Sequence, residues 1–229
     1  MPRIYRSLTA DGYTSPLSAR PSPHIRVFHE QLPGYAPTPL ISLSSVAREL
    51  GVAHVLLKNE SVRLGLPAFK ILGASWASAR AIARHLGLQW EEEAVPSLEQ
   101  LSSTIKSRGV SLTLFAATEG NHGRAVARVA KLLGVGCRIY VPRHMPSGTR
   151  DLITSEGARV VEVNGDYDLS VRQAGVAADT CEGGLLIQDT AFQQYEEICQ
   201  VCRHAEYELL SLTVHLVDCC RILNVTSRG

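Results

Sequence analysis

The sequence has almost no net charge and no long apolar run, and these two absences exclude several classes of protein. Its 229 residues include 23 lysines and arginines against 22 aspartates and glutamates, a formal net charge of +1. Such a balance gives no field that attracts nucleic acid or an anionic membrane. No stretch approaches the roughly 18 apolar residues of a membrane span, and no signal-type apolar segment follows the arginines near the N-terminus. We therefore expect a cytoplasmic protein without a nucleic-acid or membrane partner.

Lysine is also scarce. Only four of the 23 basic residues are lysines, namely Lys58, Lys70, Lys106 and Lys131. Because the chain carries its positive charge mainly on arginine, each lysine is a candidate for a specific role. Hydrophobic residues make up 45% of the chain and charged residues 20%, so the sequence can bury a core.

The six cysteines are unevenly placed, with four of them after residue 198. Cys199 and Cys202, together with the adjacent pair at 219 and 220, could suggest a zinc site. Adjacent cysteines rarely supply two ligands to one tetrahedral ion, so we expect no metal. The strand–helix rhythm also stops after Ile198. We predict that residues 199–229 are foreign to the rest of the fold, as in a frameshift, a retained intron or a splice variant.

Strands and helices alternate between residues 54 and 188. The predicted strands cover 54–58, 111–117, 137–141, 159–163 and 185–188, and the predicted helices cover 46–50, 70–86, 90–108, 121–133, 146–156 and 167–179. This βαβ spacing predicts an α/β fold with parallel strands and helices on both faces of the sheet. Residues 1–36 are rich in proline, serine and arginine, and we expect an extended arm there.

Lys70 lies in the segment Gly65–Gly73, after a turn and among apolar residues. Burial would disfavour its ammonium form and lower its pKa, and a neutral amine is the form that attacks carbonyl compounds. The alternative interpretation is a structural lysine at the start of a helix, with its charged end in solvent.

Two polar turns follow predicted strands. In residues 117–123 (ATEGNHG), a glycine-bearing turn opens a helix, which is typical of a site for a carboxylate or phosphate; an ordinary turn with Asn121 as the helix cap is the alternative. In residues 188–190 (QDT), Asp189 is either an acid–base group or a helix cap. No G-x-G-x-x-G motif follows a strand, which argues against a dinucleotide-binding domain.

Taken together, these segments resemble the fold-type II family of pyridoxal-phosphate enzymes, the tryptophan synthase β-like superfamily, and within it the diaminopropionate ammonia-lyases. The resemblance covers residues 33–198. It rests on the motifs Thr38-Pro39-Leu40, Lys58-Asn59-Glu60, Gly65-Leu66 followed by Phe69-Lys70, Ala117-Thr118-Glu119-Gly120-Asn121-His122-Gly123 and Gln188-Asp189-Thr190-Ala191.

The resemblance implies a pyridoxal 5'-phosphate cofactor and assigns roles to individual residues. Lys70 would bond covalently to the cofactor, and Asn121 would hydrogen-bond its 3'-hydroxyl. Asp189 would take the α-proton from one enantiomer of the substrate. Glu119 stands where the ammonia-lyases carry an aspartate that serves the other enantiomer.

The same resemblance makes the turn that holds Thr118, Gly120, Asn121 and His122 the site of the substrate carboxylate, bound through backbone N–H groups. The implied reaction is α,β-elimination on a small amino acid such as 2,3-diaminopropionate, giving pyruvate and ammonia. A homodimer is expected of the full-length family.

Such enzymes carry a second glycine-rich loop for the cofactor phosphate, but the adjacent glycines at 183 and 184 read as a simple turn. We therefore expect a C-terminally truncated chain with an incomplete large domain. A non-catalytic fragment, or the product of a splice variant or faulty gene model, is the alternative function. The expected units are an N-terminal arm (1–36), the start of the large domain (37–84), a small α/β domain (85–190), a return to the large domain (191–198) and the tail (199–229).

Overall fold

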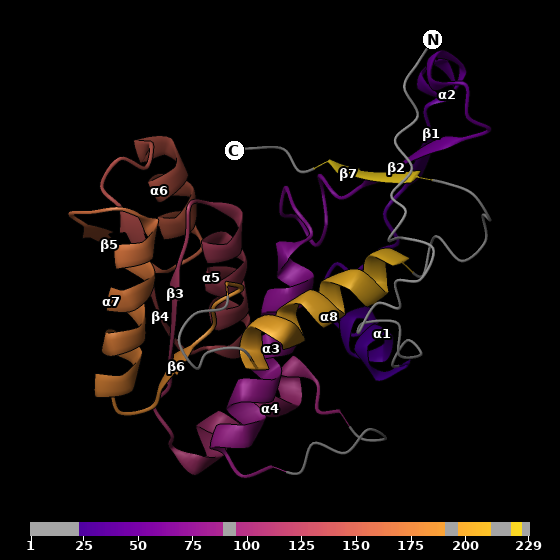
Figure 1. The fold of residues 1–229 in the computed structure, drawn as a ribbon. Coiled ribbons are helices and arrows are strands. Elements are labelled where there is room, and N and C mark those ends of the chain that lie inside the picture. Colours follow the sequence, from indigo (N-terminus) through magenta and orange to yellow (C-terminus); the bar gives the residue numbers. More distant parts are fainter. Residues whose placement is uncertain (1–22, 89–94, 191–196, 212–220, 226–229) are drawn as a thin grey trace.

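The computed structural model describes residues 23–88, 95–190, 197–211 and 221–225, and its main unit is a parallel sheet (Figure 1). The order of this sheet is β5-β4-β3-β6, and all three pairings are parallel. Its strands are β3 (Thr113–Ala117), β4 (Gly136–Pro142), β5 (Arg159–Val163) and β6 (Gly184–Leu186). The helices of the described residues are α1 (Pro23–Glu30), α2 (Ser44–Leu50), α3 (Lys70–His85), α4 (Leu98–Arg108), α5 (Asn121–Leu133), α6 (Ser147–Ser155), α7 (Tyr167–Thr180) and α8 (Glu197–Ser211).

Both faces of this sheet are covered, as the alternation of elements predicts. Successive side chains of a strand point to opposite faces. In β3, Leu114 and Ala116 therefore belong to one buried cluster, and Phe115 and Ala117 belong to another. Helix α5 covers the first face and α7 the second (Figure 1). The α/β fold with a parallel sheet and flanking helices is confirmed.

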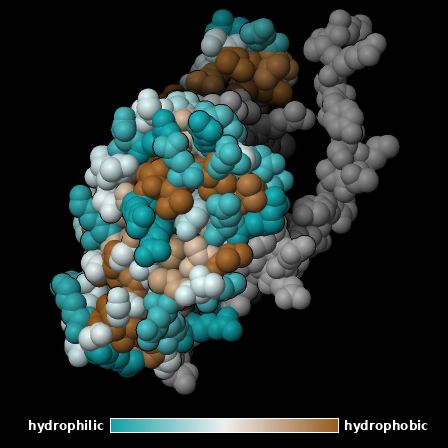
Figure 2. Space-filling view, turned by 90° about the vertical axis from the view of Figure 1, so that its left-hand side faces the viewer, coloured by the Kyte–Doolittle hydropathy of each residue, from teal (hydrophilic) through white to brown (hydrophobic). Residues whose placement is uncertain are grey.

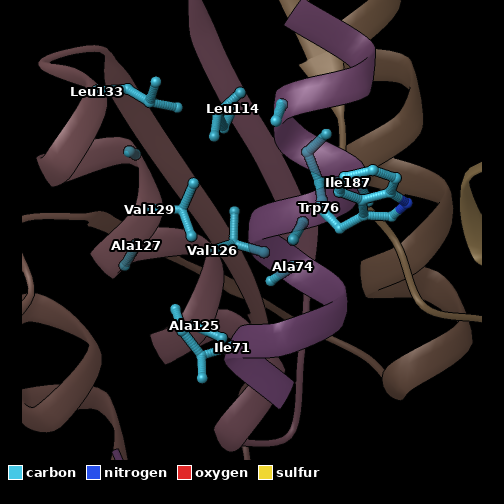
Figure 3. Close-up of a cluster of buried hydrophobic side chains, with 14 of the residues drawn as sticks. Ile71, Ala74, Trp76, Leu114, Ala125, Val126, Ala127, Val129, Leu133 and Ile187 are labelled. Atoms are coloured by element: carbon cyan, nitrogen blue, oxygen red, sulfur yellow. The ribbon is translucent and has the colours of Figure 1, made fainter. Parts of the chain in front are cut away.

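Helix α3 connects the main sheet to the C-terminal helix, because it packs against both α5 and α8. Ala74, Ala77 and Ala79 are fully buried in it, and such small side chains let neighbouring helices approach closely. Figure 3 shows Ala74 of α3 beside Val126 of α5, and Ile71 of α3 beside Ala125 of α5, within one apolar cluster. The first turn of α3 is thereby fixed relative to the sheet.

A second, smaller sheet lies beside α2 and has the order β1-β2-β7 (Figure 1). Strands β1 (Leu40–Ser42) and β2 (Val55–Asn59) are antiparallel, and β7 (Arg221–Val225) pairs with β2 in parallel. The structure thus pairs two segments from opposite ends of the sequence. Residues 221–225 fall within the predicted foreign tail, whereas 219 and 220 lie outside the described residues.

A buried network of charged and polar groups lies at the end of β2, and we call it the Glu60 cluster. It consists of Thr38, Lys58, Glu60 and Arg63. The Arg63 guanidinium donates to both oxygens of Glu60, at 2.6 and 2.7 Å, and to the Thr38 hydroxyl at 2.7 Å. Thr38 donates in turn to Glu60, and Lys58 donates to the Thr38 carbonyl at 2.7 Å. Burial opposes ionisation of Glu60, but Arg63 and Thr38 outweigh it, so the pKa of Glu60 lies below its ordinary value.

The prediction of an extended arm over residues 1–36 is wrong for its second half, because helix α1 begins at Pro23. Proline is favoured at the first position of a helix, where its missing N–H costs nothing. Ile25, Phe28 and His29 then fall on one face at helical spacing and are fully buried. Phe28 packs edge-on against Trp76 of α3, with ring centroids 5.2 Å apart. Residues 1–22 lie outside the described residues.

Several predicted element ends are confirmed, and others move. Helix α5 and strand β5 have their predicted bounds. Gly51, Gly109 and Gly134 end α2, α4 and α5 in the left-handed conformation that glycine favours. The helix predicted from residue 90 begins only at Leu98, where Ser97 and Gln100 form a reciprocal capping box. Residues 89–94 of that prediction lie outside the described residues.

The exposed surface carries scattered apolar side chains. Figure 2 shows a mostly hydrophilic face with separate apolar patches, and a larger apolar group at the level of α2 and β1. Ile41, Leu50 and Val52 are exposed in that region. Within the described residues, no helix is long and apolar enough to cross a membrane.

Candidate active site

Lys70 and Asp189 meet although they are far apart in the sequence. Lys70 is the first residue of α3, and Asp189 follows β6. The Lys70 Nζ and Asp189 Oδ2 atoms lie 2.9 Å apart, with 29% and 15% of the respective side chains exposed. Asp189 lies at the carboxyl edge of the main sheet, where open α/β sheets bind their ligands. The structure therefore brings together two of the residues that the sequence singles out.

His122, the second residue of α5, joins this pair. Its Nδ1 atom lies 3.7 Å from Asp189 Oδ2, and its Nε2 atom donates to the Ile187 carbonyl at 2.8 Å. Because a carbonyl can only accept, Nε2 carries a proton and Nδ1 is the nitrogen that faces Asp189. The Nδ1 atom is buried and has no hydrogen-bond partner within the described residues. A buried polar atom of this kind calls for a ligand or a functional role.

Glu206, which the sequence analysis did not single out, is the fourth member of the site. From helix α8 its Oε1 atom approaches Lys70 Nζ to 3.6 Å, and only 10% of its side chain is exposed. The signal in the sequence was weak: one acidic residue on a helix face that also carries Cys199 and Cys202. We call Lys70, His122, Asp189 and Glu206 the Lys70 cluster.

The predicted lowering of the Lys70 pKa is wrong. Burial does oppose the ammonium form, but the carboxylates of Glu206 and Asp189 outweigh it and raise the pKa above the ordinary value for lysine. Burial likewise opposes ionisation of Asp189, yet His122 and Lys70 keep its pKa below the ordinary value. For Glu206 burial prevails, and its pKa rises to about 7.

The turn before α5 has a fixed internal shape. The Thr118 hydroxyl accepts from the backbone N–H groups of Gly120 and Gly123 at 2.9 and 3.0 Å. Gly120 has a φ of +156° and occupies the helix cap, so Asn121 is not the cap but the first residue of α5. A Cβ atom at position 123 would lie 2.3 Å from Thr118 Cγ2, so only glycine fits there.

These contacts reduce the number of backbone N–H groups that are left to bind a carboxylate at the predicted site. The amides of Gly120 and Gly123 already donate to Thr118. The N–H groups of Asn121 and His122 open α5 and find no acceptor in the described part of the chain. The first N–H groups of a helix lack partners within the helix and suit an anionic oxygen.

Glu119 and Asn121 are not drawn into the Lys70 cluster. Glu119 is exposed and Asn121 is half-buried. Among the described residues, neither side chain forms an ion pair or hydrogen bond with Lys70 or Asp189. The roles implied for these two residues remain predictions.

The residues around Asp189 are held by side-chain hydrogen bonds. Gln188 accepts from the Ala117 amide at 2.9 Å and donates to the Tyr167 hydroxyl at 2.8 Å. The Tyr167 hydroxyl also lies 3.2 Å from the Thr190 hydroxyl. Both neighbours of Asp189 are thus anchored, which fixes the carboxylate between β6 and α5. Tyr167 was not singled out from the sequence.

The cysteines of α8 do not form a metal site with other described residues. Cys199 donates to the Asp189 carbonyl at 3.0 Å, and Cys202 is fully buried. No group of three or more potential metal ligands occurs within the described residues.

A lysine at a helix start, a carboxylate at the sheet edge and a glycine turn that opens a helix are groups suited to covalent carbonyl chemistry on an anionic ligand. Comparison with known families agrees with this class. The family described as pyridoxal-phosphate dependent enzyme matches residues 31–218, and the chain belongs to this family. The match overlaps residues 199–218, which the sequence analysis set apart as foreign.

Among curated proteins, diaminopropionate ammonia-lyase of Escherichia coli is 37% identical over 189 residues, which are 82% of this chain and 46% of that protein. The chain thus spans about half the length of the curated relatives that it matches. Crystal structures of the same E. coli enzyme superpose with TM-scores of 0.78 in the apo form, at 34% identity, and 0.79 in complex with D-serine, at 35% identity. Each covers 90% of this chain, which in turn covers 55% and 51% of the respective structures.

Proposed function

We propose that this chain contributes the lysine site of a pyridoxal-phosphate-dependent ammonia-lyase. The reaction is α,β-elimination on a small amino acid such as 2,3-diaminopropionate, which yields pyruvate and ammonia. The observation that carries the proposal is the 2.9 Å contact between the Lys70 amine and the Asp189 carboxylate at the carboxyl edge of the sheet. The 37% identity to diaminopropionate ammonia-lyase supports the choice of substrate.

The residues around Lys70 fit the aldehyde and the ring hydroxyl of the cofactor. The Lys70 side chain is 29% exposed, so a carbonyl compound can reach it. The buried Nδ1 atom of His122 has no hydrogen-bond partner within the described residues and could bind a polar group of the cofactor or substrate. Lys70 would attach the cofactor covalently, and Asn121 would hold its hydroxyl. When bound, the cofactor would take up the electron pair that the departing α-proton leaves on the substrate.

The remaining side chains would move the proton and orient the substrate. Asp189 has a lowered pKa and is ionised at neutral pH, so it can accept the α-proton of one enantiomer. Glu119 would serve the other enantiomer from the exposed turn. The N–H groups of Asn121 and His122 would bind the substrate carboxylate at the positive end of α5.

The test begins with cofactor retention. The purified chain is incubated with pyridoxal phosphate, freed of excess, reduced with borohydride and mapped by peptide mass. We expect the label on Lys70, loss of most of the total label in Lys70→Ala, and full label on Lys70 in the matched control Lys131→Ala, whose lysine is exposed. Equal labelling in Lys70→Ala and the wild type would refute the assignment of Lys70.

Activity is tested separately, by pyruvate formation from the two enantiomers of 2,3-diaminopropionate. Asp189→Asn should abolish the reaction of one enantiomer, and Glu119→Gln that of the other. A loss of both reactions in Glu119→Gln would contradict the division of roles.

The second candidate is a non-catalytic chain. The observation that favours it is coverage, because the chain matches only 46% of the curated ammonia-lyase. In that case the reduced sample carries no label on Lys70, and no pyruvate forms. We also propose a cytoplasmic location and a homodimer. Sedimentation of the purified chain would test the homodimer.

A further inference from the structure

Helix α8 packs unusually close to the first turn of α3, and a glycine makes this possible. A Cβ atom at Gly73 would lie 2.7 Å from Glu206 Oε1 and 2.8 Å from the Cys202 carbonyl oxygen. Gly73 stands three residues after Lys70, so both lie on the same side of α3. The absence of a side chain at 73 therefore lets α8 bring the buried carboxylate of Glu206 to Lys70.

The surroundings of Glu206 leave it dependent on Lys70. Its Oε1 atom is buried and accepts no hydrogen bond within the described residues. The Lys70 Nζ atom lies 3.6 Å from Glu206 Oε1 but only 2.9 Å from Asp189 Oδ2. Two carboxylates therefore share one ammonium ion, and Glu206 is the less well satisfied of the two.

We propose that Glu206 is a positioning residue of the lysine site, which together with Asp189 holds Lys70 as an ammonium ion and so restrains its reaction with aldehydes. Its importance for cofactor attachment rests on the proposed function, whereas its effect on the Lys70 amine does not. The neutral amine is the reactive form, so the charge of Glu206 sets how much of it is present.

The restraint depends on pH through Glu206 itself. Among the described residues, the titratable and charged groups that act on Glu206 are Lys70 of α3, Asp189 after β6, and Cys199, Cys202 and Arg203 of its own helix. Burial raises the pKa of Glu206 to about 7. The carboxylate is therefore charged at pH 8 and holds the ammonium ion, whereas at pH 6 it is mostly neutral and the hold weakens.

The experiment measures the reactivity of each lysine without any cofactor. Trace acetic anhydride labels the full chain between pH 6 and 10, and peptide mass spectrometry follows Lys70 relative to the internal standard Lys106. In Glu206→Gln we expect acetic anhydride to label Lys70 at least about tenfold faster than in wild type at pH 8. This is the effect of a one-unit fall in the pKa of Lys70. The ratio to wild type should approach one at pH 6.

Two variants keep the result specific. Glu99→Gln removes an exposed carboxylate from α4 and should leave the Lys70 rate unchanged, and Glu206→Asp should retain part of the restraint. An unchanged Lys70 rate in Glu206→Gln, with circular dichroism like that of wild type, overturns the proposal. If the rate rises but Lys70 retains no pyridoxal phosphate, the proposed function fails and the role of Glu206 stands.

Discussion

The Glu60 cluster and the Lys70 cluster are both buried groups of charges, but they differ in how completely their atoms are paired. In the Glu60 cluster, both carboxylate oxygens of Glu60 accept hydrogen bonds, and Arg63 and Lys58 donate. In the Lys70 cluster, His122 Nδ1 and Glu206 Oε1 are buried without hydrogen-bond partners within the described residues. A satisfied network stabilises a fold, whereas an unsatisfied one marks a place where a ligand or a proton is handled.

The largest expected effect comes from opening the satisfied cluster. Arg63→Met removes the cation from Glu60, whose side chain is fully buried, and leaves an unpaired charge. We expect the free energy of unfolding to fall by about 3–5 kcal/mol, measured by urea denaturation at pH 7. Arg26→Met, which breaks the exposed pair with Glu30, is the control and should leave the midpoint unchanged. Equal midpoints for the two variants would mean that the Glu60 cluster does not stabilise the fold.

Removing a charge from the Lys70 cluster should instead raise the free energy of unfolding. The folded-state pKa of Glu206 is about 7, above its ordinary value of 4.5, so its ionisation costs stability between these two pH values. Glu206→Gln should therefore be more stable than wild type by about 3 kcal/mol at pH 8. The difference should shrink as the pH falls from 7 and vanish near pH 4. Urea denaturation at pH 4, 6 and 8 measures it, and a constant difference would rule out titration of Glu206 as the cause.

The smallest effect concerns the packing that brings the unsatisfied cluster together. In Gly73→Ala the new methyl group meets Glu206 and Cys202, so α8 must shift, at a cost of about 1–3 kcal/mol. The matched control is Gly148→Ala in α6, where a Cβ atom meets nothing within 4 Å and alanine favours the helix. Thermal unfolding compares the two. A Gly73→Ala variant as stable as the control would show that α8 adapts without strain.

Sequence reasoning predicted the features that depend on local pattern. The main sheet and the bounds of α5 follow from the alternation of strands and helices and from glycine positions. Family motifs implied roles for both Lys70 and Asp189, but not the 2.9 Å contact between them. The helix α1 was missed because proline-rich composition hid a helical face formed by Ile25, Phe28 and His29.

The Lys70 pKa could not be predicted in the same way. Its direction depends on the balance between burial and the charges of Asp189 and Glu206, which approach only in the folded chain. Glu206 was missed for the same reason, since no local motif reveals that α8 lies against the start of α3.

The Thr118 hydroxyl has a consequence for how a ligand would arrive at α5. By accepting from two amides of the following turn, it occupies the place that an anion would otherwise fill, and it sets the turn before any ligand is present. The amides of Asn121 and His122 follow this turn directly and have no acceptor within the described residues. A carboxylate bound there, as we propose, would cost little chain entropy, because the turn already has its shape.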